Sequence, residues 1–401
     1  MKYREFKGKK ISSLGFGAMR FPTVKVGDVT EVDLALTERM IDRAMEAGIN
    51  YFDTAYPYHA GQSEIILGKL LSKYPRDSYY IADKYPGHQL MDSYDPAEIF
   101  EEQLAKCGVD YFDFYLLHNV YENSMPTYLD ERWGIIDYFL EEKRRGRIRH
   151  LGFSSHGTPR NLREFLERTN GAMEFCQIQY NYLDDTLQHA DEKCRILDEY
   201  GIPIWVMEPV RGGKLANLPA PARERLDAHD PNATSASFGF RWVLDNPSVT
   251  VVLSGMSDMA QLEDNIRTFA GYEPLSPDER KTLSEIAEQL KCSVPCTACR
   301  YCTDGCPMGL DIPALIEVYN ELSCAKSLNT AMRVEFLPDD KKPDACIKCG
   351  KCTKICPQKI DIPGVLEGLS EILSSMPSWR AVSRERAEAA ARIRFEKSGE
   401  R

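Results

Sequence analysis

Hydrophobic residues follow two alternating patterns from Ile11 to about residue 270. Short runs rich in β-branched and aromatic residues predict strands, and the amphipathic stretches between them predict helices, such as 158–170 with Thr158 as its N-cap. The eight predicted strands span residues 12–19, 50–54, 79–84, 112–118, 148–155, 175–180, 202–209 and 250–255. Eight strand–helix units in roughly 260 residues are typical of one α/β fold, the (β/α)8 TIM barrel.

The alternative fold is a doubly wound open sheet. That fold needs a glycine-rich turn after its first strand, and none follows residues 12–19. Residues 1–275 are therefore assigned to the barrel, and residues 276–291 to a linker helix that Ser276 caps and Pro277 opens. Residues 292–376 form a small, mainly helical domain, and residues 377–401 a charged tail.

Two cysteine clusters, fifty residues apart, share the spacing C-x2-C-x2-C-x3-C followed by proline. In the bacterial ferredoxin run, three of these thiolates hold one iron–sulfur cluster and the fourth serves the other cluster. The spacing predicts two [4Fe–4S] clusters with exchanged fourth ligands, namely Cys296, Cys299, Cys302 and Cys356 for one, and Cys346, Cys349, Cys352 and Cys306 for the other. Structural zinc is the alternative, but zinc sites separate their two C-x2-C pairs by about a dozen residues or more. This part resembles the two-[4Fe–4S] ferredoxin domains, and its long spacing is more like that of helical ferredoxin modules.

Composition narrows the class of protein. The formal charge is −11 and no basic stripe is present, so nucleic acid is not an expected partner. The chain has no apolar run long enough to cross a bilayer, and residues 1–10 are charged where a signal peptide would be apolar. Eight of the 13 cysteines lie in the two clusters, which indicates metal in a reducing compartment. We therefore expect a cytoplasmic protein that does not bind membranes.

Polar and ionisable side chains occur at the carboxyl ends of successive predicted strands. In a TIM barrel, active-site residues gather at this end. The residues at these positions are Asp53 with Tyr58 beyond it, Lys84, His118, Ser154 with Ser155, Gln177, Met207 and Ser254. Each one alone has an ordinary structural explanation, such as capping, solvation or packing, and only their joint placement favours an active site.

Four stretches, in order, resemble the aldo-keto reductases over residues 5–270. They are YFDTAYPYHAGQSEIILG, IADK, DFYLLH and GRIRHLGFSS. The chemistry agrees with this resemblance, because hydride addition to a carbonyl leaves an alkoxide that needs a proton, and tyrosine is a reluctant acid near neutral pH. We expect Tyr58 to be the acid, Lys84 to lower its pKa, Asp53 to orient Lys84, and His118 to donate a hydrogen bond to the carbonyl oxygen.

The resemblance also implies a site for NAD(P)H. Ser154 and Gln177 would contact the carboxamide and Asn265 the adenine, and the pyrophosphate would lie under Arg211, Gly212, Gly213 and Leu215. Ser155, Met207 and Ser254 complete the expected cofactor contacts. Three features depart from the family pattern. Ser155 replaces an asparagine, Met207 replaces a stacking tyrosine, and the positions that grip a 2′-phosphate hold Gly255, Met256 and Gln261. The choice between NAD and NADP is therefore open.

These parts together predict an NAD(P)-dependent oxidoreductase with Tyr58 as general acid and a small carbonyl, sugar or quinone-like substrate. The two clusters would serve electron transfer, docking or structure. One alternative is a redox enzyme that uses the clusters in catalysis through a flavin or a redox partner protein, although no flavin motif is recognisable. Another is an electron-transfer or assembly subunit in which the barrel is only a scaffold.

Overall fold

The computed structural model describes residues 1–401 except 27–28, 90, 92, 292–293, 297 and 400–401. The chain divides into two compact units. The first, here called the barrel unit, comprises residues 1–284 together with 386–401, and the second, here called the cluster unit, comprises residues 285–385. Among the described residues, no helix has both the length and the apolar character needed to cross a membrane.

Eight parallel strands close into a barrel in the first unit, as the hydrophobic pattern predicts. Their order around the barrel is β10-β11-β12-β3-β6-β7-β8-β9, so each strand pairs with its neighbours in the chain and the last pairs with the first. The strands are β3 (Leu14–Gly17), β6 (Tyr51–Asp53), β7 (Tyr80–Tyr85), β8 (Phe112–Leu117), β9 (Ile148–Ser155), β10 (Cys176–Gln179), β11 (Ile204–Met207) and β12 (Val249–Ser254). Every one falls within or beside a predicted run.

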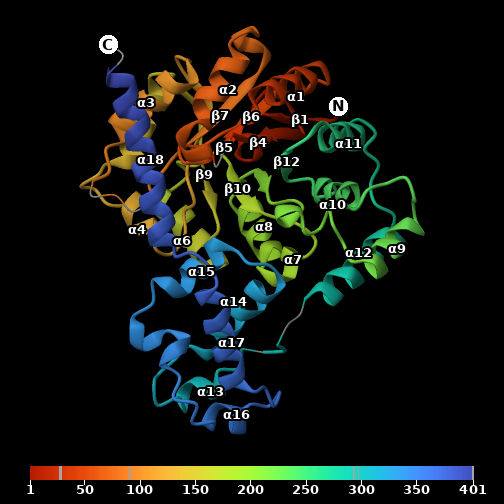
Figure 1. The fold of residues 1–401 in the computed structure, drawn as a ribbon, viewed down its shortest axis with the longest axis vertical. Coiled ribbons are helices and arrows are strands. Elements are labelled where there is room, and N and C mark those ends of the chain that lie inside the picture. The colour runs from red at the N-terminus through yellow and green to blue at the C-terminus, as the bar shows by residue number, and fades with distance from the viewer. Residues whose placement is uncertain (27–28, 90, 92, 292–293, 297, 400–401) are drawn as a thin grey trace. The chain divides into compact units, whose positions relative to one another are not determined.

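Helices surround these strands, and Figure 1 shows them outside the barrel in chain order. Thr158 caps α6 as predicted, and Asp95 and Asp258 cap α3 and α11, each by accepting backbone N–H hydrogen bonds. The helices of this unit are α1 (Leu34–Glu46), α2 (Ser63–Leu71), α3 (Pro96–Cys107), α4 (Met125–Tyr128), α5 (Ile135–Arg144), α6 (Pro159–Thr169), α7 (Asp184–Leu187), α8 (Ala190–Glu199), α9 (Ala220–Asp227), α10 (Ser235–Leu244) and α11 (Met259–Ala270).

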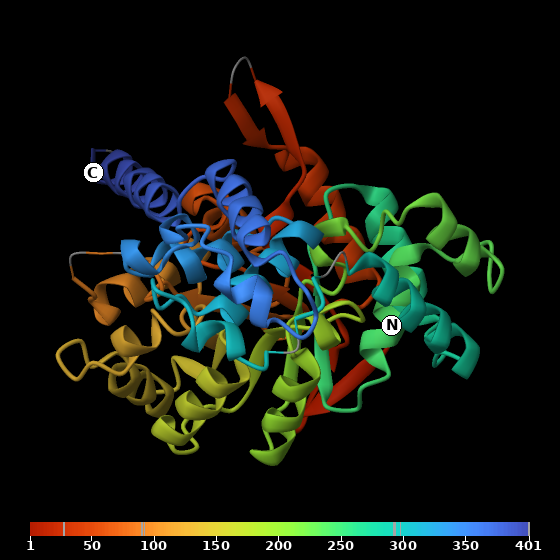
Figure 2. The same ribbon diagram turned by 90° about the horizontal axis from the view of Figure 1, so that it is seen from below.

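Two hairpins were not predicted from the sequence. The first joins β1 (Tyr3–Phe6) to β2 (Lys9–Ser12) through Lys7 and Gly8, which both have positive φ as a tight two-residue turn requires. It places Phe6 and Ile11 in one buried cluster with barrel-interior side chains such as Phe114 and Trp205. The second joins β4 (Thr23–Val26) to β5 (Val29–Val32), and Figure 2 shows it projecting away from the strands of the barrel.

The cluster unit is helical and internally repeated. Helix α13 (Tyr301–Asp304) packs against α16 (Lys351–Ile355), and α14 (Ile312–Cys324) packs against α17 (Ile362–Ser374). Each long helix follows one cysteine cluster and is capped by the aspartate of an identical DIP sequence, Asp311 or Asp361. The remaining elements are α15 (Leu328–Glu335), η5 (Asp339–Lys341) and η6 (Pro343–Ala345).

The domain boundaries differ from the predicted ones at both ends of the cluster unit. The predicted linker helix exists as α12 (Pro277–Leu290), but the division between units falls inside it, after Ser284. Arg241 and Asp245 of the barrel unit bind the first turns of α12 through Glu279 and Arg280, which explains why its start belongs to the barrel. The predicted tail is helix α18 (Trp379–Gly399), and residues from Arg386 onward belong to the barrel unit.

Candidate functional site

Asp53 and Lys84 form a buried ion pair at the carboxyl ends of two neighbouring strands. Asp53 ends β6, and Lys84 is the next-to-last residue of β7, which pairs with β6. Lys84 Nζ lies 2.5 Å from Oδ1 of Asp53 and donates a second hydrogen bond to the Thr54 carbonyl oxygen at 2.6 Å. The Lys84 side chain is fully buried, so these two oxygens replace the water that its charge would otherwise need.

Tyr58 and His118 complete this group. Tyr58 begins the 3-10 helix η2 (Tyr58–Gly61), and the centroid of its ring is 5.0 Å from Lys84 Nζ. His118 follows β8, and its ring lies edge-on to that of Tyr58 with 5.9 Å between centroids. The Tyr128 hydroxyl donates to the His118 carbonyl oxygen at 2.6 Å, which holds this residue in place. The structure therefore brings together all four residues of the predicted tetrad.

Burial and nearby charges shift the pKa values of Lys84 and Tyr58 in opposite directions. Burial alone would lower the pKa of Lys84, but Asp53 and Tyr58 raise it above its ordinary value, so the ammonium stays protonated. Burial raises the pKa of Tyr58, and Lys84 offsets that rise only in part. Lys84 thus lowers the pKa of Tyr58 as expected, but the net value lies above the ordinary one, because desolvating the phenolate outweighs the nearby ammonium.

Two histidines that the sequence analysis missed join the same group. His88 lies in the loop after β7, and its ring centroid is 4.4 Å from that of His118. His156 directly follows β9. Burial lowers the pKa of His88 and of His156 to about 3, and it lowers the pKa of His118 well below the ordinary value, so all three rings are neutral. Their positions in the sequence could have identified them, because each histidine comes shortly after the end of a predicted strand.

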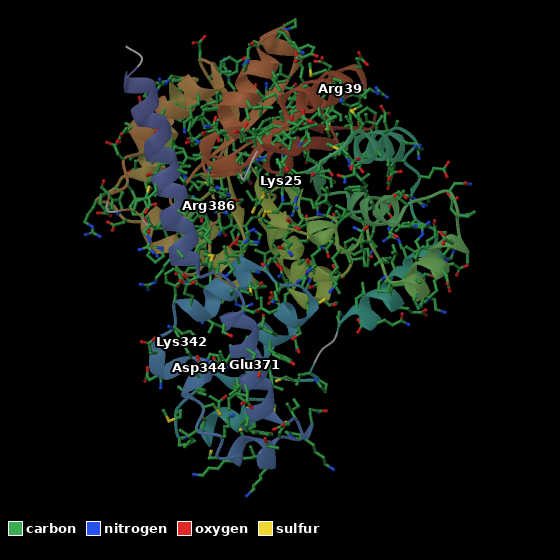
Figure 3. The ribbon with its side chains drawn as sticks, in the orientation of Figure 1. Lys25, Arg39, Lys342, Asp344, Glu371 and Arg386 are labelled. Atoms are coloured by element: carbon green, nitrogen blue, oxygen red, sulfur yellow. The ribbon has the colours of Figure 1, made fainter. Side chains whose placement is uncertain are left out.

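The C-terminal helix adds a cation to this environment. Arg386 is half-buried on α18 and belongs to the barrel unit (Figure 3). Burial raises the pKa of Tyr58 and lowers that of His118, and the positive charge of Arg386 lowers both pKa values. The sequence analysis described this segment only as a charged tail, because nothing in its local pattern relates it to the strand ends of the barrel.

A buried polar network supports the strand that carries Lys84. Gln103 Nε2 donates to the Lys84 carbonyl oxygen at 3.1 Å and to Glu64 at 3.0 Å. Glu64 is also paired with Lys106 at 3.0 Å, and both side chains are almost fully buried. Oδ1 of Asp83 accepts the Lys84 N–H at 2.8 Å. The Lys84 carbonyl is thus held by Gln103 of α3, which Glu64 of α2 holds in turn, and the Lys84 N–H is held by Asp83 of its own strand.

A cavity of about 520 Å³ lies at the ends of β11 and β12. Gly212 and Gly213 line it from the loop after β11, and Ser254 and Asn265 line it from β12 and α11. Asn265 Nδ2 donates to Ser254 Oγ at 3.0 Å. Both residues are among the predicted cofactor contacts, and a cavity of this size that combines apolar walls with convergent polar side chains is typical of a cofactor site.

Among the buried amide oxygens that have no hydrogen-bond partner in the described part of the chain, two lie on or just after barrel strands. They are Oε1 of Gln177, on β10, and Oδ1 of Asn119, directly after His118. A buried acceptor without a donor is destabilising until a ligand supplies the donor. These atoms therefore fit the amide group of a nicotinamide, and Asn119 is a candidate contact that the sequence analysis missed.

The other predicted carboxamide contacts are engaged within the protein. Ser154 Oγ accepts the Asn119 N–H at 2.8 Å, and Ser155 Oγ donates to the Val120 carbonyl oxygen at 2.8 Å. Met207 lies with its sulfur 3.6 Å from Gln177 Nε2. These two serines therefore hold the loop after β8, which is a structural reason for the departure from asparagine at position 155.

The loop predicted to cover a pyrophosphate separates into two parts. Gly212 and Gly213 adopt positive φ and line the cavity, so their backbone can approach a ligand closely. The Arg211 guanidinium instead pairs with buried Asp184, and Leu215 is fully buried. Arg211 and Leu215 therefore anchor the loop, and Gly212 and Gly213 are its members that line the cavity.

Each predicted set of four cysteines lines one small cavity in the cluster unit. The first cavity is lined by Cys296, Cys299, Cys302 and Cys356, and the second by Cys306, Cys346, Cys349 and Cys352. The fourth thiol of each set thus comes from the other repeat, in the arrangement that the spacing predicts. Over the residues whose positions are described, no three His, Cys, Asp or Glu side chains are grouped closely enough to hold a single metal ion. Four thiols around one cavity fit a [4Fe–4S] cluster, which spans them with its own iron atoms.

The backbone of the two cysteine loops is repeated as closely as the sequence. Positive φ occurs at Ala298, Arg300 and Gly309, and again at Lys348, Gly350 and Lys359, each pair fifty residues apart. Non-glycine residues adopt this conformation at an energetic cost of about 1–3 kcal/mol, which the surrounding structure must offset. The same strained turns in both loops indicate one shared purpose, and wrapping the backbone around a bound cluster is such a purpose.

Comparison with known proteins identifies the two parts separately. Residues 13–288 match the model of the aldo/keto reductase family, and residues 295–360 match that of the 4Fe-4S dicluster domain. The barrel and the two-cluster ferredoxin-type region expected from the sequence are thus confirmed.

The relatives and the solved structure described here match 63–71% of the chain. The chain is 26% identical over 297 residues to the NADH-specific methylglyoxal reductase of Escherichia coli, covering 63% of this chain and 88% of the relative. It is 27% identical over 304 residues to L-galactose dehydrogenase of Arabidopsis thaliana, covering 70% and 90%. Among solved structures, the holo form of an aldo-keto reductase from Bacillus halodurans is similar, with a TM-score of 0.56 at 26% identity over 71% of this chain and 96% of that one.

Proposed function

The chain belongs to the aldo/keto reductase family, and from this premise we propose that it reduces a small carbonyl substrate with hydride from NAD(P)H. The observation that carries the proposal is the buried Asp53–Lys84 pair under the Tyr58 ring, with His118 edge-on to it. A scaffold barrel would not need a fully buried lysine charge at the end where TIM-barrel enzymes have their active sites.

A reduced nicotinamide, when bound, supplies the hydride. Gln177 and Asn119 would hold its amide group through their buried oxygens, and the Gly212–Gly213 backbone, Ser254 and Asn265 would hold the rest of the nucleotide. The relative from E. coli is named as NADH-specific, and this chain has no lysine or arginine at the three positions held by Gly255, Met256 and Gln261. We therefore propose that NADH is preferred over NADPH.

Tyr58 supplies the proton. When the substrate carbonyl carbon takes up a hydride, its oxygen gains negative charge and accepts the Tyr58 hydroxyl proton. The Lys84 ammonium stabilises the phenolate that forms, and Asp53 keeps that ammonium charged and in place. The lowered pKa of His118 keeps its ring neutral, and a neutral imidazole retains one ring N–H, which can donate to the same oxygen.

The cluster unit is proposed to hold two [4Fe–4S] clusters. The support is the division of eight cysteines into two sets of four, each around one cavity and each drawn from both repeats. A hydride carries two electrons and a cluster takes up one at a time. The clusters are therefore proposed to exchange electrons with a partner protein and not directly with the nucleotide.

The test of the proposed reaction is Tyr58→Phe in the cluster-loaded protein. Loss of a positioned general acid is expected to lower kcat/KM for carbonyl reduction by about 10²- to 10⁴-fold, with little change in the affinity for NADH. Tyr85→Phe is the matched control, since Tyr85 is a buried tyrosine on the same strand as Lys84 but packs against Phe139. Unchanged carbonyl turnover in Tyr58→Phe would contradict the proposal.

A further inference from the structure

The two cluster-binding repeats have the same backbone but different surfaces. Residues 346–360 contain four lysines and no acidic residue, whereas the equivalent residues 296–310 contain one arginine and one aspartate. The lysines of the second repeat are Lys348, Lys351, Lys354 and Lys359, and the corresponding positions of the first repeat hold Ala298, Tyr301, Asp304 and Gly309. Cluster binding requires the cysteines and the turns, which both repeats share, so it does not explain the lysines.

These lysines are available to a partner. All four are exposed, and only Lys348 is paired, with Glu367 at 2.6 Å. Lys351, Lys354 and Lys359 make no ion pair with any residue that the structure describes. A folded protein does not need three unpaired cations around one loop, and the chain as a whole has a formal charge of −11. The second repeat is therefore a basic area on an acidic protein.

Two large apolar side chains lie exposed within this basic area. Ile347 is 59% exposed and Ile355 is 52% exposed, and Tyr301 of the adjacent helix α13 is 58% exposed. The equivalent positions of the first repeat hold Thr297 and Gly305, so these two isoleucines have no apolar counterpart there, and the exposed Tyr301 stands at the position equivalent to Lys351. An apolar centre with a charged rim is the usual composition of a transient protein interface.

The same residues lie against one of the two cysteine cavities. Ile347 and Lys351 line the cavity that is also lined by Cys306, Cys346, Cys349 and Cys352, and Cys349 is itself exposed. Helices α13 and α16 pack side by side next to these loops (Figure 1). A protein seated on Ile347 would thus be separated from the cluster of the second repeat by a single layer of side chains.

We infer that the second repeat, through Ile347, Ile355 and the lysines around them, docks a small acidic protein that carries one electron. This inference rests on the proposed function, because it requires the clusters to be present. In the exchange, the reduced carrier loses one electron and the oxidised cluster held by Cys306, Cys346, Cys349 and Cys352 gains it, with no bond formed or broken. The basic surface attracts and orients the carrier while the rest of the acidic chain repels it.

The experiment uses the full chain with its clusters, purified without oxygen. A small acidic [2Fe–2S] ferredoxin, reduced with dithionite and then desalted, serves as the probe. Stopped-flow spectroscopy follows cluster reduction at low and at high ionic strength in wild type, in Lys351→Glu/Lys354→Glu, and in the control Lys25→Glu/Lys69→Glu. The control has the same change in net charge at exposed lysines of the barrel unit. EPR of the dithionite-reduced proteins shows whether each variant holds its clusters.

We expect the second-order rate constant of Lys351→Glu/Lys354→Glu to fall about tenfold or more at low ionic strength, with the difference shrinking as salt screens the charges. The control variant should keep the wild-type rate. Equal rates for wild type and Lys351→Glu/Lys354→Glu, or an equal loss in the control, would overturn the docking surface. Absence of the cluster EPR signal in wild type would instead overturn the cluster assignment on which the inference rests.

Discussion

The two units of this protein build their sites in opposite ways. In the barrel unit, Lys84 and Asp53 are already paired beneath Tyr58, and a large hydrophobic core surrounds the strands that carry them. In the cluster unit, the core is small, and it includes Cys302 and Cys352 while Cys299 and Cys349 are exposed. The thiols are therefore part of what holds the cluster unit together, whereas the tetrad is held by a barrel that is stable around it.

The two units differ in whether the fold stabilises the site or the site stabilises the fold. A TIM barrel buries enough apolar surface to fix polar groups in unfavourable surroundings, such as a lysine charge with no access to water. A unit of about 100 residues buries much less apolar surface, and its loops are in strained conformations. In such a unit a bound metal group supplies part of the folding free energy. We therefore expect the barrel to fold without help from its site, and the cluster unit to depend on bound clusters for its fold.

The largest difference between the two units is expected when the clusters are removed. Oxidative removal with ferricyanide and a chelator is expected to unfold the cluster unit, because its thiols lose the groups that join the two repeats. Hydrogen exchange should then rise by about 100-fold or more in α14 and α17 and stay near the native rate in β6, β7 and β8. Cys324→Ala, which alters a buried thiol of the same unit outside both cavities, should leave exchange in α14 and α17 slow. Unchanged exchange in α14 and α17 after cluster loss would contradict the comparison.

Replacing either of two buried lysines tests which of them is needed for catalysis and which only for stability. Lys84→Met leaves Asp53 buried without its cation, and Lys106→Met leaves Glu64 in the same state. Each is expected to lower the free energy of unfolding by about 3–5 kcal/mol. Only Lys84→Met should also abolish carbonyl turnover at a temperature where both variants are folded, as circular dichroism would show. An equal loss of turnover in Lys106→Met would mean that the network acts in catalysis as well as in positioning.

Acid should weaken the barrel through its neutral histidines. The folded pKa values of His88 and His156 are about 3, against 6.5 for an ordinary histidine, so between these values the unfolded chain binds protons that the folded barrel does not. Stability should be full above pH 6.5 and fall as the pH drops toward 3, by about 1.4 kcal/mol per pH unit for each such histidine. Urea titrations followed by tryptophan fluorescence would measure this, since three of the four tryptophans, Trp133, Trp205 and Trp242, lie in the barrel unit. The slope should be smaller in His88→Gln, and an identical slope would refute the assignment to His88.

The smallest expected effect concerns the nucleotide. Gln261 lines the large cavity, and its side chain is held by Asp258 at 2.9 Å and by the Ser257 N–H at 2.9 Å. Gln261→Arg would place a cation where a 2′-phosphate could lie, and should shift the ratio of KM values toward NADPH by about tenfold, or about 1.4 kcal/mol. Gln261→Met is the matched control without a charge and should leave the ratio unchanged. A shift of the same size in both variants would place the nucleotide elsewhere.

Much of this architecture could be predicted from local patterns. Eight strands were predicted because short β-rich runs alternate with amphipathic stretches, and Thr158 and Ser276 mark the starts of α6 and α12. The hairpin at residues 3–12 was missed, although Lys7-Gly8 between two short alternating runs is a turn signal. The position of Asn119 was also missed, because an amide directly after a strand-end histidine has no distinctive motif.

The sequence by itself determined the strand and helix order, the cysteine spacing and which side chains stand at strand ends, because these depend on residues near one another in the chain. Only the tertiary structure decided that burial raises the pKa of Tyr58, that the Arg211 guanidinium pairs with Asp184, and that Arg386 from the C-terminal helix acts on the tetrad. Each of these depends on what surrounds a side chain, and the surroundings come from residues distant in the chain, brought into contact when the barrel closes.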